Sequence, residues 1–254
     1  MDPLREHGTD LASLHDHALA ALGEAENDRS PSTLRAALEL TEELLESSSD
    51  DAEAHYLRGF ALYLSWTTGF ALRREAMAEF RHTLDRDPGH PWARFHVIEL
   101  CYSAGMHEEA IGHFGGMSES WFAERDLVWR YLLAWEYAVA AKIALRRFDE
   151  VWDELPRLVD RYVELEDSDD ILEAPARLLA QWRRLPPDHE FGEYLAGQLR
   201  RFVPGGWLKP DDLIVVPDRT GLSHAFLPAA QVSGDAVLPG HSTLHQPAQQ
   251  QRHQ

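Results

Sequence analysis

The sequence contains very little cysteine and very little lysine. Cys101 is the single cysteine among 254 residues, which excludes an internal disulfide and a zinc site built from several thiolates. Lys142 and Lys209 are the two lysines, and the arginines are scattered along the chain. No apolar run is as long as a membrane-spanning helix, and the polar stretch 1–6 is unlike a secretory signal. We therefore expect a soluble, cytoplasmic protein.

Positive charge is scarce relative to negative charge. The chain has 24 Lys and Arg against 43 Asp and Glu, which gives a formal net charge of −19. Nucleic-acid backbones and anionic membranes bind basic surfaces, so neither is an expected partner. The acidic runs 42–53 and 164–170 favour a basic protein or peptide instead. Hydrophobic residues make up 44% of the chain, which is enough for a folded core.

Apolar residues recur at helical spacing over most of the chain. This periodicity and the residues that interrupt it predict helices over about 9–26, 31–46, 52–65, 70–86, 92–104, 107–114, 121–145, 150–165, 171–185 and 188–202. Ser30 or Ser32 is expected to cap the second of these helices, and Gly105 to end the fifth. A turn is expected over 146–149, and either Asp149 or Asp153 can cap the helix that follows, in which Pro156 is tolerated only in the first turn. The segment 121–145 contains no Gly or Pro and has apolar residues on most sides. It predicts one long helix at the centre of the fold.

The composition predicts four regions. Residues 1–8 are expected to be a flexible N-terminus, and 9–202 an α-helical domain. The Pro- and Gly-rich stretch 203–236 is expected to form a tail with a small β-hairpin over 213–227. Residues 237–254 are expected to be disordered.

A 34-residue spacing relates two of the predicted helices. Ala76 and Phe80 recur as Ala110 and Phe114, with a small residue upstream and a proline downstream of the first pair. A small residue lets two antiparallel helices approach closely, an aromatic ring fills the groove beside it, and a proline ends the second helix. The positions of this pattern are Gly59, Ala76, Phe80, Pro88, Ala110 and Phe114.

At these residues the segment 55–117 resembles the tetratricopeptide repeat family, with departures at Arg58, Leu62 and Ile98. The resemblance implies an all-α fold of antiparallel helix hairpins stacked into a right-handed superhelix. It also implies a concave groove, lined by the first helix of each hairpin, that binds peptides or partner helices. The corresponding groove positions here are Tyr56, Tyr63, Trp92, Phe95, Glu99 and Tyr102.

The sequence therefore predicts a non-catalytic adaptor that binds a protein or peptide in an acidic, aromatic-lined groove. No catalytic, metal-binding or cofactor motif is found. Glu109 and His113 lie one helical turn apart but lack the second histidine of a metalloprotease helix. Cys101 lies five residues from His96, so the two do not share a helix face as a catalytic dyad would.

Two alternatives remain open at this point. An acidic inhibitor or immunity-type protein that blocks a basic enzyme would have the same charge. An all-helical enzyme or small-ligand receptor would need a pocket around the helix 121–145, where Trp129, Trp135, Glu136 and Tyr137 are the residues to examine.

Overall fold

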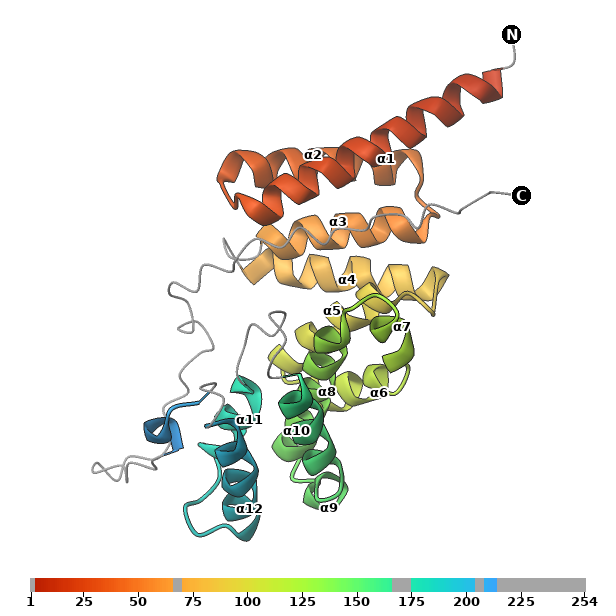
Figure 1. The fold of residues 1–254 in the computed structure, drawn as a ribbon. Coiled ribbons are helices and arrows are strands. Elements are labelled where there is room, and N and C mark those ends of the chain that lie inside the picture. Colours follow the sequence, from red (N-terminus) through yellow and green to blue (C-terminus); the bar gives the residue numbers. More distant parts are fainter. Residues whose placement is uncertain (1–2, 66–69, 166–174, 204–207, 214–254) are drawn as a thin grey trace. The chain divides into compact units, whose positions relative to one another are not determined.

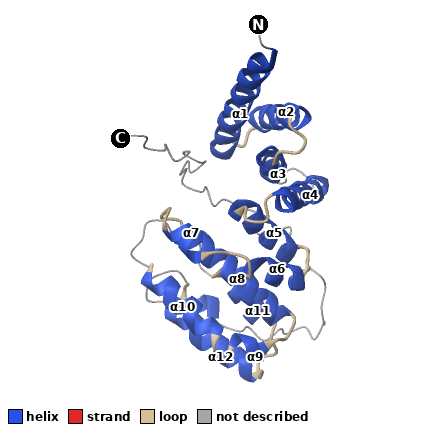
Figure 2. Ribbon diagram, turned by 90° about the vertical axis from the view of Figure 1, so that its right-hand side faces the viewer, coloured by secondary structure: helices blue, strands red, loops and turns tan. Residues whose placement is uncertain are grey.

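The fold is known from a computed structural model that describes residues 3–65, 70–165, 175–203 and 208–213. These residues form helices joined by turns and loops and include no strand, so the all-α prediction is confirmed for them (Figures 1 and 2). The predicted hairpin over 213–227 and the predicted disorder of 237–254 lie outside the described residues, apart from Leu213. The sequence predicted one helical domain over 9–202, whereas the structure divides at Ala93 into two compact units.

The first unit consists of two antiparallel helix pairs. Its helices are α1 (Pro3–Asn27), α2 (Pro31–Ser47), α3 (Ala52–Ser65) and α4 (Phe70–Arg86). Helix α1 pairs with α2 and α3 with α4, and α3 also contacts both α1 and α2 (Figure 1). Helix α1 begins at Pro3 and so includes residues 3–8, which were expected to be flexible.

Local sequence explains the helix ends in this unit. Ser30 or Ser32 was predicted to cap α2, and the cap is Ser30. Its hydroxyl accepts a hydrogen bond from the Thr33 amide at 3.4 Å, with Pro31 as the first helical residue. Pro88 lies in the exposed turn after α4, as the repeat pattern predicted. The breaks before α2 and after α4 thus coincide with residues that favour a helix terminus.

Gly59 lets α3 and α4 approach closely. A Cβ atom at this position would lie 2.9 Å from two ring atoms of Phe80, a distance that real side chains do not adopt. Phe80 and Ala76 are both fully buried. The small residue and the ring therefore have the packing roles that the 34-residue pattern predicted.

The second unit is arranged around α8. Its helices are α5 (Pro91–Ser103, which begins in the first unit), α6 (His107–Phe114), α7 (Glu119–Ala123), α8 (Val128–Ala144), α9 (Phe148–Val151), α10 (Glu154–Glu164), α11 (Ala176–Trp182) and α12 (Glu190–Leu199), followed by 3-10 turns at Arg200–Phe202 and Pro210–Leu213. Helix α8 contacts α6, α7, α9, α10 and α11. Ala110 of α6 is fully buried, and Phe114 packs 6.3 Å from Trp135 of α8.

The predicted single helix over 121–145 is wrong in its first part. Helix α7 ends at Ala123, and Asp126 adopts a left-handed φ of 56°. The amide of Leu127 donates to the Phe122 carbonyl at 2.9 Å, which closes a Schellman turn. Aspartate tolerates this conformation better than most residues, so a helix can end without glycine or proline.

Two further helices end with the same turn. Gly105 was predicted to end the helix before it and has φ 77° after α5. Arg146 has φ 60° after α8, and the Arg147 amide donates to the Lys142 carbonyl at 2.9 Å. The turn expected over 146–149 is present only in its first part, because α9 begins at Phe148. Arg146 stands there in a position that favours glycine.

Candidate functional site

The predicted groove residues of the first unit are mostly core side chains. Tyr56 is 4% exposed, with its ring 5.9 Å from that of Phe80 and 4.7 Å from that of His90. Trp92 is 9% exposed, and Tyr63 is half-buried. Helix α4 and the turn after it cover the ring of Tyr56, so its prediction as a partner-binding anchor is not supported by its position.

The predicted groove residues of the second unit are engaged within that unit. Phe95 is 2% exposed. The side chain of Glu99 is 17% exposed and lies 3.8 Å from the ring of His96. The Tyr102 hydroxyl accepts a hydrogen bond from the Gln181 amide at 2.8 Å, and burial raises the pKa of Tyr102. Half of the six predicted groove residues are thus buried rings rather than exposed anchors.

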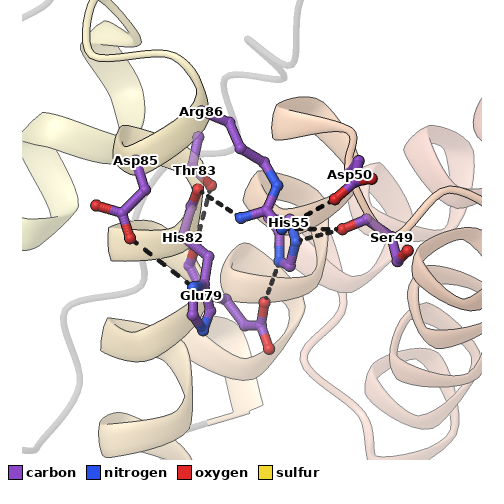
Figure 3. Close-up of polar contacts among 8 residues, drawn as sticks. All are labelled: Ser49, Asp50, His55, Glu79, His82, Thr83, Asp85 and Arg86. Carbon is purple, nitrogen blue, oxygen red and sulfur yellow. Dashed lines mark hydrogen bonds and ion pairs between the residues drawn. The ribbon is translucent and has the colours of Figure 1, made fainter.

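A histidine that the sequence analysis did not select lies at the centre of a polar cluster in the first unit (Figure 3). His55 of α3 is 7% exposed. Its Nδ1 lies 2.6 Å from Glu79 Oε2 of α4, and its Nε2 lies 2.9 Å from the Ser49 carbonyl before α3. Arg86 donates to the same carbonyl at 3.1 Å and lies 3.6 Å from the Asp50 carboxylate. These contacts fasten the loop between α2 and α3 to α4.

The geometry of His55 leaves neither ring nitrogen available for chemistry. A carbonyl oxygen cannot donate, so Nε2 carries a hydrogen toward Ser49. The Glu79 carboxyl occupies the Nδ1 side of the ring at 2.6 Å. A general base or a metal ligand needs a free lone pair on the ring, and here both nitrogens hold structural contacts. The role of His55 is therefore structural: it holds the loop before α3 against α4.

His90 has a related structural role before α5. Its Nδ1 accepts a hydrogen bond from the Ala93 amide at 3.1 Å, which caps the first turn of that helix. Its Nε2 lies 3.2 Å from Glu53 Oε2 of α3. Because Nδ1 is an acceptor, the hydrogen is on Nε2 and points to the carboxylate. His90 thus links α3 to the start of α5.

The second unit contains a fully buried carboxylate on α8. Glu136 Oε1 accepts hydrogen bonds from the amides of Arg177 at 2.8 Å and Leu178 at 3.3 Å, both at the start of α11. Its Oε2 accepts from the Tyr162 hydroxyl of α10 at 3.1 Å. The Arg177 guanidinium lies 3.9 Å from Oε2 and donates to the Tyr137 hydroxyl at 3.0 Å. One side chain thereby joins three helices.

Burial dominates the electrostatics of this cluster. It raises the pKa of Glu136 above its ordinary value, although Arg177 and the hydrogen bonds favour the ionised form. It also raises the pKa of Tyr162 well above its ordinary value, and the neighbouring Glu136 adds to this effect. Glu136 is fully inaccessible to solvent, so a substrate cannot reach it without opening the packing of α8.

A second buried carboxylate holds α10 on α8. Glu154 is 9% exposed and accepts a hydrogen bond from the Trp135 indole at 2.7 Å. The Lys142 ammonium donates to its other oxygen at 2.5 Å. Trp135, Glu136 and Tyr137 are three of the four residues, with Trp129, around which a ligand pocket was to be sought. Their polar atoms instead hold the helices of the second unit together.

A groove of about 680 Å³ lies between α1 and α2 of the first unit. Three partly exposed leucines, one from α2 and two from α1, form its apolar part, and polar side chains surround them. The lining residues are Leu11, Ser13, Leu14, His17, Leu40, Glu43 and Ser47. No lysine or arginine is among them.

This groove opens on the side of α2 away from α3. The carbonyl of Leu38 accepts a hydrogen bond from Arg58 of α3 at 3.0 Å, which marks the covered side. Leu40 follows two residues later, and two residues rotate a helix by about 200°. The leucines of the groove are thus left partly exposed by the packing of the first unit itself.

Sequence signals for these residues were present in part. Glu136 was named only as a residue around which a ligand pocket would form, and its partners on α10 and α11 are 26 and 41 residues away. His55 lies among the mostly apolar residues 54–57 of the sequence, and a histidine buried there needs polar partners. Leu11, Leu14 and Leu40 follow the helical pattern and could not be told from core residues.

Three further observations bear on the kind of site that the chain contains. Within the described residues, no three His, Cys, Asp or Glu side chains are grouped so that they could hold a metal ion. None of the helices in the described part of the chain is long and apolar enough to cross a membrane. Searches against protein families, curated proteins and solved structures find no match to this chain.

Proposed function

We propose that this protein is a non-catalytic scaffold that binds another polypeptide, and that the groove between α1 and α2 is its binding surface. One observation carries the proposal. The groove leaves three leucines partly exposed on one surface of the first unit. Contiguous exposed apolar side chains with a polar rim are typical of protein-interaction sites.

The polar clusters support a binding role over a catalytic one. The nitrogens of His55 and the oxygens of Glu136 and Glu154 contact groups of the same unit. A catalytic acid or base must reach a substrate atom at hydrogen-bond distance. These buried groups instead stabilise the packing that holds the groove helices and the helices around α8.

Site-specific photo-crosslinking tests the proposal. A photoreactive amino acid replaces Ser47 in the groove or, as the control, the exposed Ala78 on α4. We expect a polypeptide to be captured from Ser47 in cells, and the same purified polypeptide to bind the purified protein with a dissociation constant in the micromolar range or tighter. Capture from Ala78 alone, or loss of binding after purification, would contradict the proposed surface.

A further inference from the structure

The helix α2 presents a row of acidic side chains beside the groove. Glu39, Glu43 and Glu46 follow one another at spacings of four and three residues, so they form one stripe along the helix. All three are exposed, and Glu43 also lines the groove. Arg35 is the single basic residue of α2. The groove therefore combines an apolar floor with a negative edge.

The first unit already shows that the α1–α2 pair can accept a helix. Helix α3 packs in contact with both α1 and α2 on the side that Leu38 marks. The groove with Leu40 lies on the opposite side of α2, between the same two helices. A helix has the width to fill such a groove, with side chains at i, i+3, i+4 and i+7 as anchors.

We propose that the α1–α2 groove binds an amphipathic helix of a partner protein whose leucine-like stripe is flanked by lysine or arginine. This proposal rests on the function proposed above and adds the class of partner. Charge complementarity selects a basic partner, because its cations would lie against the stripe of Glu39, Glu43 and Glu46. It disfavours a second copy of this chain, since two acidic edges would then face one another.

The test uses a synthetic helical peptide of 18 residues, which spans about 27 Å and so matches the length of α2. Three peptides are compared by fluorescence anisotropy with the full-length protein. The first has a leucine stripe flanked by lysines, the second has the same stripe flanked by glutamines, and the third has the composition of the first in scrambled order. We expect the first to bind about tenfold more tightly than either of the others at ~0.1 M salt.

Variants of the protein locate the binding. E39Q/E43Q/E46Q removes three exposed charges and leaves the core intact. It should weaken binding of the lysine peptide about tenfold and reduce the dependence on salt. The matched control E75Q/D85N/E124Q removes three exposed charges outside α1 and α2 and should change binding less than about threefold. Circular dichroism and the thermal midpoint establish that both variants are folded.

The outcomes separate the two proposals. Equal binding of the lysine and glutamine peptides in the groove would overturn the basic partner and keep the polypeptide-binding function. If the scrambled peptide binds as tightly as the lysine peptide, the amphipathic-helix proposal is overturned as well, because charge alone would then explain the affinity. Failure of all three peptides, together with photo-capture of a polypeptide without a basic helix, would reject this partner class. A dimer of the wild-type chain that E39Q/E43Q/E46Q strengthens would assign the groove to a second copy.

Discussion

Removal of the buried Glu136 carboxylate should strongly destabilise the second unit. In Glu136→Ala, the amides of Arg177 and Leu178 and the hydroxyl of Tyr162 lose their acceptor at distances of 2.8, 3.3 and 3.1 Å. The Arg177 guanidinium also loses the carboxylate 3.9 Å away. Breaking a buried ion pair from one side typically costs about 3–5 kcal/mol, which is the loss of unfolding free energy that we expect.

The conservative variant Glu136→Gln gives the sign of the pH dependence. The pKa of Glu136 is raised in the folded protein, so the folded state binds its proton more tightly than the unfolded state. The contribution of this group to stability therefore falls as pH rises from the ordinary pKa of a glutamate through the raised one. Glutamine does not titrate, so Glu136→Gln should gain stability relative to wild type as pH increases over this interval.

Urea unfolding followed by circular dichroism measures these differences, and amide exchange assigns them to a unit. Exchange should accelerate in α8, α10 and α11 of Glu136→Ala but not in α3. The control Asp160→Ala breaks an exposed ion pair with Arg201 and should cost less than about 1 kcal/mol. Two results would refute the reasoning. One is a loss of unfolding free energy below about 1 kcal/mol for Glu136→Ala, and the other is a Glu136→Gln variant whose stability falls relative to wild type as pH rises.

Three further changes test the packing of the helix pairs by urea unfolding. Gly59→Ala should destabilise the first unit by about 1–3 kcal/mol, because its Cβ would clash with the Phe80 ring; an unchanged midpoint would mean that the ring moves aside. Arg146→Gly should stabilise the second unit by about 1 kcal/mol, since φ is 60° there; destabilisation would show that the arginine side chain contributes more than the turn. His55→Phe should destabilise the first unit by about 1–3 kcal/mol because the Ser49 carbonyl and Glu79 lose their shared partner. A stability equal to that of wild type would show that the contacts of His55 do not stabilise the unit.

Local sequence signals predicted most helices and several of their ends. Ser30 with Pro31 marked the start of α2, and Gly105 marked the end of α5. Pro156 was compatible with a helix only in its first turn, and it is the third residue of α10. These residues act on the backbone near them, so their effect can be deduced without the rest of the fold.

Signals that depend on distant partners were harder to deduce. The turn at Asp126 depends on a conformation that aspartate tolerates but does not require, so 121–145 was predicted as one helix. Helical spacing places Tyr56 on a definite face of α3 but does not say whether another element covers that face. The groove leucines present the reverse case, because their pattern is that of core residues and their exposure depends on which helices pack against α1 and α2.

Methyl NMR of the leucines can locate the binding surface on the protein. The full-length protein, with labelled leucine methyl groups, is titrated with the lysine-flanked amphipathic peptide. We expect the methyl signals of Leu11, Leu14 and Leu40 to shift, while those of the fully buried Leu57 and Leu132 stay unchanged. Shifts that avoid the three groove leucines and cluster elsewhere would contradict the assignment of the α1–α2 groove as the binding surface.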